Sequence, residues 1–335
     1  MTDWLQKQWA TYTLWQLLLT PLSWLFFVMA SIRVRLYKSG WLKSYRLSVP
    51  VIVVGNINVG GTGKTPLVIW LAEQLLQAGY KPGVISRGYG GQIKAAQAVF
   101  ADSNPQQLGD EPVLIAKRTN CPVFVSPDRV AAGQALLRAH PECNVIISDD
   151  GLQHYQLQRD VEIVVFDSVK AFGNEALLPA GPLRENVSRL RSVDTVVSNG
   201  TVADVQQFVS LYGVKPIEMQ LQSGDFFNLL DVSKRSTAAG FAGQQVLAIA
   251  GIGNPERFFQ QLNHMGISFS RKSYPDHYAF SVDDFEVANE NVVMTEKDAV
   301  KCHAFAQQNF WVLPVNALIK DGLLAIILNK LSRRE

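Results

Sequence analysis

Residues 51–77 read VIVVGNINVGGTGKTPLVIWLAEQLLQ, and this stretch decides the fold class of the chain. The apolar residues 51–54 predict a short strand, and residues 65–77 predict a helix that ends before Gly79. Between them, the glycine-rich residues 60–63 let the backbone approach a ligand closely, and their amides can cradle phosphate oxygens. The order of strand, glycine loop and helix, with Lys64 and Thr65 at the start of the helix, predicts a P-loop nucleotide site.

Eight consecutive residues form the expected phosphate-binding loop. Lys64 would contact the β- and γ-phosphates, and the Thr65 hydroxyl would bind Mg²⁺. The common GxxxxGK[ST] pattern begins with glycine, where this chain has Asn58. An ordinary glycine turn would not require both a lysine and a threonine in these places. We therefore expect the nucleotide phosphates to contact Asn58, Val59, Gly60, Gly61, Thr62, Gly63, Lys64 and Thr65.

A P-loop also needs an acidic partner for its metal at the end of a neighbouring strand. Residues 144–150 read NVIISDD, an apolar run that ends in the carboxylates of Asp149 and Asp150. Without a P-loop, such a pair would as readily belong to a solvated loop. After a P-loop, we expect one of the two carboxylates to serve Mg²⁺, directly or through water.

Further apolar runs alternate with helical patterns along the chain. Several are rich in β-branched residues, which is typical of strands buried in a parallel sheet: residues 82–86, 122–125, 145–148, 161–167 and 195–198. A second β-α-β pattern begins near residue 244, and residues 310–315 predict one of its strands. We expect an α/β fold with a P-loop NTPase-like parallel sheet domain and a second, smaller α/β domain that contributes to the cleft.

The expected boundaries follow from these patterns. An N-terminal apolar segment covers residues 1–40, a nucleotide-binding domain covers residues 41–220, and the second domain covers residues 221–335, with the connection near residues 200–243. The GKT block at residues 63–65 lies in the first of these domains and the block PDHY at residues 275–278 in the second, which predicts a cleft that closes around both ligands.

The composition excludes several classes of protein. The chain has 335 residues, of which 47% are hydrophobic and 18% charged, so it can bury a core. A formal net charge of +2 without a basic stripe gives no reason to expect nucleic acid. Cys121, Cys143 and Cys302 stand far apart, which indicates neither a disulfide framework nor a zinc site.

The N-terminal segment differs from the rest of the chain. Residues 14–30 read LWQLLLTPLSWLFFVMA without a charge, tryptophans stand at positions 4, 9, 15 and 24, and five basic residues follow between positions 33 and 46. The run could span a membrane with its flanks, lie in the interface, or pack on the domain as a hydrophobic helix. We favour membrane association, and the basic cluster then predicts a catalytic domain on the cytoplasmic side.

Eight sequence blocks stand in the order found in the tetraacyldisaccharide 4'-kinase family, and the chain resembles that family over nearly its whole length. The blocks are GNINVGGTGKTP (55–66), SRGYGG (86–91), GDEP (109–112), DDGLQH (149–154), PAGPLRE (179–185), GIGNPERFF (251–259), PDHYAF (275–280) and MTEKDAVK (294–301). Asn58 fits the form that the loop takes in this family. The resemblance implies an ATP- and Mg²⁺-dependent kinase of lipid A biosynthesis, which phosphorylates the 4'-hydroxyl of a tetraacyldisaccharide 1-phosphate at the cytoplasmic face of the bacterial inner membrane.

The resemblance also implies roles for single residues. Asp110 and His277 match the pair that activates the attacking sugar hydroxyl, and which of the two takes the proton stays open. Arg87 matches a position near the transferred phosphoryl group. The metal-proximal positions are matched by Thr65, Asp149, Asp150, Gln153 and Glu185. Without the resemblance, Arg87 would be a surface residue, His277 a polar loop residue and Asp110 a turn or N-cap aspartate. Four more residues of the blocks carry no implied role: His154, Arg184, Glu296 and Lys297.

Two other functions compete with the lipid kinase. A membrane-recruited regulatory P-loop ATPase or GTPase often has a second lysine early in the loop, where this chain has Val59. A membrane scaffold with a relic P-loop would not need Lys64, Thr65 and both carboxylates intact. The expected partners are therefore an acylated disaccharide lipid and the membrane, with no nucleic acid and no obligate protein partner.

Overall fold

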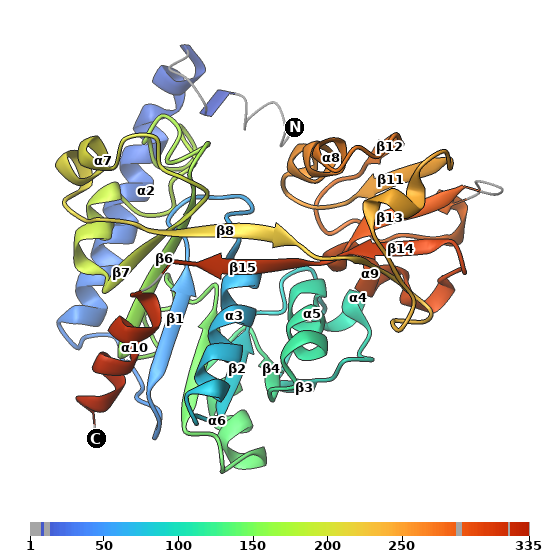
Figure 1. Cartoon of the computed structure of the whole chain (residues 1–335). Helices are drawn as coiled ribbons and strands as arrows, with labels where there is room; N and C mark the ends of the chain where they lie inside the picture. Colours follow the sequence, from blue (N-terminus) through green and yellow to red (C-terminus); the bar gives the residue numbers. More distant parts are fainter. Residues whose placement is uncertain (1–7, 10–13, 286–289, 321, 335) are drawn as a thin grey trace.

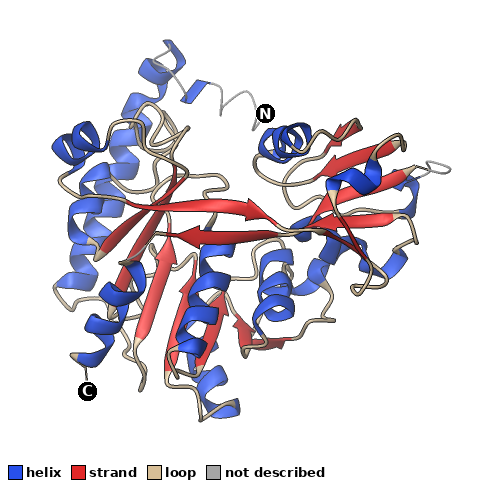
Figure 2. Ribbon diagram, viewed as in Figure 1, coloured by secondary structure: helices blue, strands red, loops and turns tan. Residues whose placement is uncertain are grey.

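The computed structural model describes residues 8–9, 14–285, 290–320 and 322–334, and Trp4 lies outside them. Two sheets lie side by side in this part of the chain (Figures 1 and 2). The larger has nine strands in the order β15-β8-β7-β6-β1-β5-β2-β4-β3, and the smaller has six in the order β10-β9-β14-β13-β11-β12. The expected α/β fold, with a P-loop sheet and a second, smaller sheet, is confirmed.

The large sheet is parallel in its centre and antiparallel at both edges, where β3 pairs with β4 and β15 pairs with β8. Its central strands are apolar and fully buried, as expected for strands covered on both faces. The strands are β1 Val51–Gly55, β2 Pro82–Ser86, β3 Gln97–Val99, β4 Val123–Val125, β5 Val145–Asp149, β6 Val161–Asp167, β7 Thr195–Asn199, β8 Ile217–Ser223 and β15 Val315–Ile319. In the register of β1 and β5, Val54 lies beside Asp149, so the P-loop and the acidic pair leave the same edge of the sheet.

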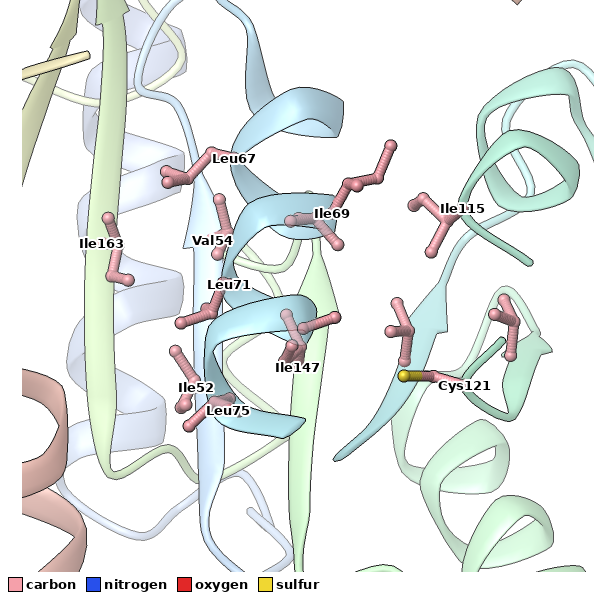
Figure 3. Close-up of a cluster of buried hydrophobic side chains, with 14 of the residues drawn as sticks. Ile52, Val54, Leu67, Ile69, Leu71, Leu75, Ile115, Cys121, Ile147 and Ile163 are labelled. Carbon is pink, nitrogen blue, oxygen red and sulfur yellow. The ribbon is translucent and has the colours of Figure 1, made fainter. Parts of the chain in front are cut away.

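Helices cover both faces of the large sheet. One face is packed by α3 Lys64–Gln77, α5 Asp110–Thr119 and α10 Leu323–Ser332. Figure 3 shows this core, in which Leu67 and Leu71 of α3 face Ile52 and Val54 of β1. The other face is packed by α6 Arg129–Ala139, α7 Val205–Tyr212 and the 3₁₀ helix η1 Val187–Ser192, and a short helix, α4 Pro105–Leu108, precedes α5.

The small sheet has its own two cores. Its strands are β9 Phe226–Asn228, β10 Arg235–Ser236, β11 Val246–Ala250, β12 Ser270–Ser273, β13 Asn291–Thr295 and β14 Phe310–Leu313. The helix α8 Pro255–His264 packs on one face, and α9 Glu296–Cys302 packs on the other. Three short 3₁₀ helices complete this part: η2 Ala238–Phe241, η3 Val282–Phe285 and η4 His303–Phe305.

The sheets do not divide at residue 220 as the sequence patterns predicted. The interval 200–243, expected to be a connection, contains α7, β8, β9, β10 and η2. After β14 the chain leaves the small sheet at Pro314, and both β15 and α10 return to the large one. The interval 310–315 is therefore two strands in different sheets, because proline has no N–H with which to continue a ladder.

The helix α2 Leu14–Lys38 is longer than the charge-free run and continues into the basic residues. It is long and apolar enough to cross a membrane by length and composition. Ser23 is its one buried residue among those described, and large apolar side chains are exposed along its length. The Ser23 hydroxyl donates to the Leu177 carbonyl at 2.8 Å and accepts from the Ala180 N–H at 2.9 Å. The helix therefore contacts the domain through Ser23, and its large apolar side chains are not part of the domain core.

Candidate active site

The glycine loop lies between β1 and α3, where the backbone must turn sharply. Gly60 and Gly63 have φ angles of 109° and 92°, a region that other residues rarely adopt. A Cβ on Gly63 would also lie 2.5 Å from the Asn199 Nδ2 atom. Asn199, at the end of β7, donates to the Thr62 carbonyl at 3.1 Å and so holds the backbone of the loop in place. Asn199 was not singled out in the sequence, because nothing local connects it to residue 62.

Asn58 and Val59 are engaged within the protein. The Asn58 Nδ2 atom donates to the Ala171 carbonyl at 3.2 Å, and the Val59 N–H donates to the Pro182 carbonyl at 2.9 Å. These contacts attach the first half of the loop to the segment after β6. The loop residues that remain open toward a ligand are Gly60 and Gly61, which are exposed, and Gly63, Lys64 and Thr65, which are half-buried.

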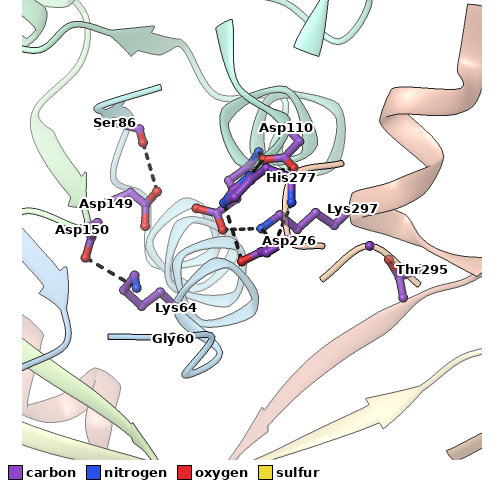
Figure 4. A network of polar contacts seen from close by, with 12 residues as sticks. Gly60, Lys64, Ser86, Asp110, Asp149, Asp150, Asp276, His277, Thr295 and Lys297 are labelled. Carbon is purple, nitrogen blue, oxygen red and sulfur yellow. Dashed lines mark hydrogen bonds and ion pairs between the residues drawn. The ribbon is translucent and has the colours of Figure 1, made fainter. Parts of the chain in front are cut away.

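Lys64 and the acidic pair meet at the edge of the sheet (Figure 4). The Lys64 Nζ atom lies 3.5 Å from the Asp150 Oδ1 atom, and the Arg184 guanidinium lies 3.4 Å from Asp150 Oδ2. Asp149 is fully buried and accepts a hydrogen bond from the Ser86 hydroxyl at 3.1 Å. Lys64 is therefore paired with Asp150, while Asp149 is held by Ser86.

The pKa values of the two carboxylates shift in opposite directions. Burial, reinforced by the charges of Glu111 and Asp150, raises the pKa of Asp149 to about 7. Burial would also raise the pKa of Asp150, but the charges of Lys64, Arg184 and Arg129 outweigh it and hold that pKa below its usual value. Asp150 is therefore anionic at neutral pH, whereas Lys64 and the hydrogen bond from Ser86 offset only part of the effect of burial on Asp149.

The acidic pair also fits a divalent cation. One oxygen of each side chain, Oδ1 of Asp149 and of Asp150, is buried without a hydrogen-bond partner. In the described part of the chain, no three Asp, Glu, His or Cys side chains gather into a complete metal cage. Mg²⁺ commonly takes one or two carboxylates and fills its remaining positions with phosphate and water, so this donor set suits it.

Gln153 and Glu185 lie in a separate hydrogen-bonded cluster. The Gln153 Nε2 atom donates to the Asn56 carbonyl at 3.0 Å and to Glu185 Oε1 at 2.8 Å. The second oxygen of Glu185 accepts from the Tyr155 hydroxyl at 2.8 Å and from Arg189 Nε at 3.2 Å. Both Glu185 oxygens therefore have protein partners, and the cluster is attached to the start of the P-loop through Asn56.

Asp110 and His277 come from different halves of the molecule and contact each other where the two halves meet (Figure 4). Asp110 is the first residue of α5, with Gly109 as N-cap, so the alternative of an N-cap aspartate is wrong. The His277 Nδ1 atom lies 2.9 and 3.0 Å from the two Asp110 carboxylate oxygens. Asp110 is 4% exposed, and its neighbours hold it as an anion although it is buried.

Their pKa values move apart. Burial would raise the pKa of Asp110, but the hydrogen bond from His277 and the charges of Lys297, His277 and Lys301 lower it. Burial would lower the pKa of His277, but the hydrogen bond to Asp110 and the charges of Asp110 and Asp276 together outweigh it and raise that pKa. The result is an ionised carboxylate that orients a basic imidazole.

The loop after β2 covers this pair. The Tyr89 ring lies 5.0 Å from the imidazole of His277, centroid to centroid. Arg87 is exposed, and its guanidinium forms no ion pair or hydrogen bond with the residues that the structure describes. Its positive charge contributes to lowering the pKa of the buried Arg129. The Arg129 guanidinium donates to the Asp149 and Asp150 carbonyls at 3.3 and 3.2 Å.

The turn after β11 brings the small sheet onto the P-loop. An added Cβ on Gly253 would lie 3.2 Å from the Gly61 N atom, so the two backbones approach closely. Beside them, Arg257 of α8 forms an ion pair of 3.3 Å with Asp167 at the end of β6. Neither contact was predicted, because each joins residues that are far apart in the sequence.

Comparisons with known proteins agree with this geometry. A family model described as Tetraacyldisaccharide-1-P 4'-kinase matches residues 15–332. The Tetraacyldisaccharide 4'-kinase of Methylobacillus flagellatus is 51% identical over 331 residues, covering 98% of this chain and 96% of that protein. The protein of the same name from Azoarcus sp. is 49% identical over 316 residues, covering 94% and 92%.

A solved structure shares the fold over almost the whole chain. It is the crystal structure of LpxK from Aquifex aeolicus in complex with ATP, with a TM-score of 0.79 and 31% identity, covering 96% of this chain and 99% of that one. The alternatives of a regulatory switch and of a scaffold have no such support. The chain belongs to the tetraacyldisaccharide 4'-kinase family.

Proposed function

We propose that this protein transfers the γ-phosphate of ATP to the 4'-hydroxyl of a tetraacyldisaccharide 1-phosphate, the acylated disaccharide precursor of lipid A. Membership of the family and the ATP-bound solved relative support this activity. The observation that carries the proposal is the contact of Asp110 with His277 near the residues of the phosphate site. Figure 4 draws Lys64, Asp149 and Asp150 in the same close-up as this pair, and the charge of Glu111, which follows Asp110, acts on the pKa of Asp149.

The P-loop residues 60–65 hold the β- and γ-phosphates in this proposal. Lys64 is already directed at the acidic edge by its ion pair with Asp150, so its ammonium is placed where phosphate charge would lie. Asn58 and Val59 fix the start of the loop through their hydrogen bonds to Ala171 and Pro182. Arg87, exposed and without a fixed partner, is free to reach the transferred phosphoryl group with its planar donors.

Thr65, Asp149 and Asp150 would hold Mg²⁺. The ion, when bound, supplies positive charge between the phosphate oxygens and the two carboxylates. Gln153 and Glu185 position the loop through Asn56, because both Glu185 oxygens are occupied by protein donors. We assign these two residues a supporting role beside the ion.

Asp110 and His277 remove the proton from the attacking hydroxyl. The carboxylate accepts from Nδ1, which fixes the ring and leaves Nε2 on the other side, 3.7 Å from Asp276 Oδ2. The pair acts as one unit that receives the hydroxyl proton as the bond between the γ-phosphorus and the 4'-oxygen forms and the bond from the γ-phosphorus to the bridging oxygen of ATP breaks, which releases ADP. The nucleotide-binding domain in this account comprises the large sheet with β15 and α10, and the second domain comprises the small sheet that carries His277.

The protein acts at the cytoplasmic face of the inner membrane. The exposed apolar side chains of α2 favour insertion into lipid, and the basic residues at its end favour the cytoplasmic headgroups. Ser23 of α2 is hydrogen-bonded to Leu177 and Ala180 of the large half. Membrane binding through α2 would therefore hold the domain beside the bilayer that contains the acceptor lipid.

Transfer of labelled γ-phosphate from ATP to a tetraacylated disaccharide 1-phosphate in detergent micelles tests the proposal. We expect label in the lipid with wild-type protein and none with Lys64→Ala. Release of labelled inorganic phosphate at the same rate with and without the lipid, with no label in the lipid, would contradict the kinase activity and favour a nucleotide switch.

A further inference from the structure

The sequence block MTEKDAVK, residues 294–301, builds the start of α9 and fixes it in place. The Asp298 N–H donates to the Thr295 hydroxyl oxygen at 3.2 Å, and that hydroxyl donates to Asp298 Oδ2 at 2.7 Å. Asp298 also accepts from the Gly251 N–H at 3.1 Å, which ties the helix to the turn after β11. Lys297 therefore sits in the first turn of a helix whose position is fixed by its cap.

Lys297 joins the two chain segments that carry the basic pair. Its Nζ atom lies 3.0 Å from Glu111 Oε1 and 3.0 Å from Asp276 Oδ1 (Figure 4). Glu111 directly follows Asp110, and Asp276 directly precedes His277. One ammonium group thus connects α5 of the large half with the histidine loop of the small half.

Asp276 in turn holds the backbone of His277. Its Oδ1 atom accepts from the His277 N–H at 3.1 Å, and it is the same oxygen that receives Lys297. His277 has a φ of 60°, in the left-handed region that residues other than glycine rarely adopt. Fixing Asp276 therefore fixes the unusual backbone geometry that directs the imidazole toward Asp110.

A second contact between α5 and α9 provides an internal comparison. Arg118, near the end of α5, contacts Glu296 through Nη1 at 2.7 and 2.8 Å and Asn316 through Nη2 at 2.5 Å. This contact holds the same two helices together, but neither Glu296 nor Asn316 neighbours Asp110 or His277 in the chain. Arg118 thus stabilises the interface without touching the segments of the basic pair.

We propose that Lys297 is a positioning residue for phosphotransfer: by joining Glu111 and Asp276, it holds Asp110 and His277 in contact between the two halves of the molecule. The inference rests on the proposed function, because it assumes that this pair activates the acceptor hydroxyl. Lys297 does not touch the reacting atoms and acts through the two carboxylates.

The charge of Lys297 also acts on the pair. Burial would lower the pKa of Lys297, but the carboxylates of Glu111, Asp110 and Asp276 raise it, so the side chain stays protonated. Its charge lowers the pKa of Asp110 and that of His277. The other titratable or charged side chains around the pair, from α5, α9, the histidine loop and the loop after β2, are Glu111, Lys301, Asp298, Asp276 and Tyr89.

The substitution Lys297→Met in the full chain, assayed in micelles, tests the proposal. We expect kcat to fall by about 10- to 100-fold, the loss typical of a reacting group misplaced by about 1 Å, with little change in the KM for ATP. The pKa of Asp110 rises without the ammonium, because a nearby positive charge is lost and the contact with His277 is weaker, so the acid limb of the kcat/KM profile moves to higher pH. A folded Lys297→Met protein with wild-type kcat and acid limb would overturn the proposal.

Arg118→Met is the matched control, since it loosens the same helix interface. We expect it to lower the melting temperature and leave the acid limb where it is. If Arg118→Met and Lys297→Met shifted the acid limb equally, Lys297 would be a general interface residue and the proposal would be wrong. Two further outcomes separate the hypotheses: no label in the lipid with the wild-type protein refutes the proposed function, whereas an inactive Asp110→Asn beside a normal Lys297→Met refutes only the present inference.

Asp276→Asn keeps the test decisive if Lys297→Met does not fold. Asparagine retains an oxygen for the His277 N–H but loses the ion pair with Lys297. We expect a loss of kcat in the same direction, and wild-type kcat in this variant would overturn the proposal. If both single variants fold, their double variant is expected to be scarcely worse than Lys297→Met, because the lysine acts through Asp276.

Discussion

Replacing Asp110 and His277, singly and together, tests whether they act as one unit. The proposed substitutions are Asp110→Asn and His277→Gln, which keep the approximate volume of each side chain. The Nδ1 atom lies 2.9 and 3.0 Å from the two carboxylate oxygens, and Asp110 is 4% exposed, so the hydrogen bond is charged and shielded from water. Asp110→Asn removes the negative charge of the contact, and His277→Gln removes its basic ring.

The size of the effect follows from this geometry. A hydrogen bond to a charged group contributes about 1.5–3 kcal/mol. If it is needed only to orient the base, its loss corresponds to roughly 10- to 150-fold in rate. Removing the proton acceptor itself costs about 10²- to 10⁴-fold. We therefore expect a loss of about 10²- to 10⁴-fold in kcat for each single variant, with modest change in the KM for ATP.

The double variant decides the question. The effects of residues that act together are non-additive, so the kcat of the double variant should be within about threefold of that of the less active single variant. The assay is transfer of labelled γ-phosphate to the lipid acceptor at saturating ATP, with melting temperatures measured for all four proteins. Losses that multiply in the double variant would show that the residues act separately, and a rise only in the KM for lipid would make His277 a substrate-binding residue.

The remaining predictions concern other parts of the molecule. Lys64→Ala should lower kcat by at least about 10²-fold, because the phosphate charge loses its fixed cation, and near-normal turnover would remove the P-loop from the mechanism. Asp149→Asn should raise the Mg²⁺ concentration needed for half-maximal rate, and an unchanged Mg²⁺ titration would place the ion elsewhere. Arg257→Ala should weaken ATP binding by no more than about fivefold, as a half-exposed ion pair contributes about 0.2–1 kcal/mol, and a larger loss by calorimetry would show that Arg257 contacts the nucleotide. Without ligands, the stability that His277 adds relative to His277→Gln should be full below the ordinary imidazole pKa and be lost as pH rises through its raised value; a pH-independent difference in melting temperature would contradict the charged contact with Asp110. Replacing the exposed residues Leu18, Leu22 and Leu25 of α2 with glutamate should move the protein from the membrane fraction to the soluble one. Unchanged fractionation of the folded variant would show that another surface binds the membrane.

The P-loop half of the site could be predicted from local sequence. The loop, its lysine and its threonine are consecutive, and Asp149 ends a strand whose apolar pattern shows that it belongs in the same sheet. Because strands of a parallel sheet end at one edge, the proximity of Lys64 and Asp150 follows without tertiary information. Family resemblance was not required for this part.

The other half of the site depends on contacts that local patterns do not contain. Asp110 and His277 are separated by 167 positions, and their hydrogen bond exists because α9 and the turn after β11 place the small sheet against α5. The resemblance supplied this pair, whereas charge and spacing alone favoured a loop histidine. The role of Lys297 had no local signal either, since a lysine in the first turn of a helix is an ordinary surface feature until Glu111 and Asp276 are found on either side of it.

The domain boundary was missed for a different physical reason. The strand β8 is only partly buried near the edge of its sheet, and β15 alternates between half-buried and exposed residues, so neither has the continuous apolar run that marked the central strands. Pro314 separates β14 from β15, and the two strands read as one apolar segment. The local sequence of β15 does not indicate which of the two sheets this strand joins after Pro314.

The position of the transferred phosphate on the lipid tests the central claim most directly. A tetraacylated disaccharide 1-phosphate is incubated with wild-type protein, ATP and Mg²⁺, and the product is analysed by mass spectrometry and phosphorus NMR beside an acceptor whose 4'-hydroxyl is methylated. The account predicts one added phosphate at the 4' position of the first lipid and none on the methylated one. A phosphorylated methylated acceptor, a phosphate at another hydroxyl, or ATP hydrolysis without a phosphorylated lipid would contradict it.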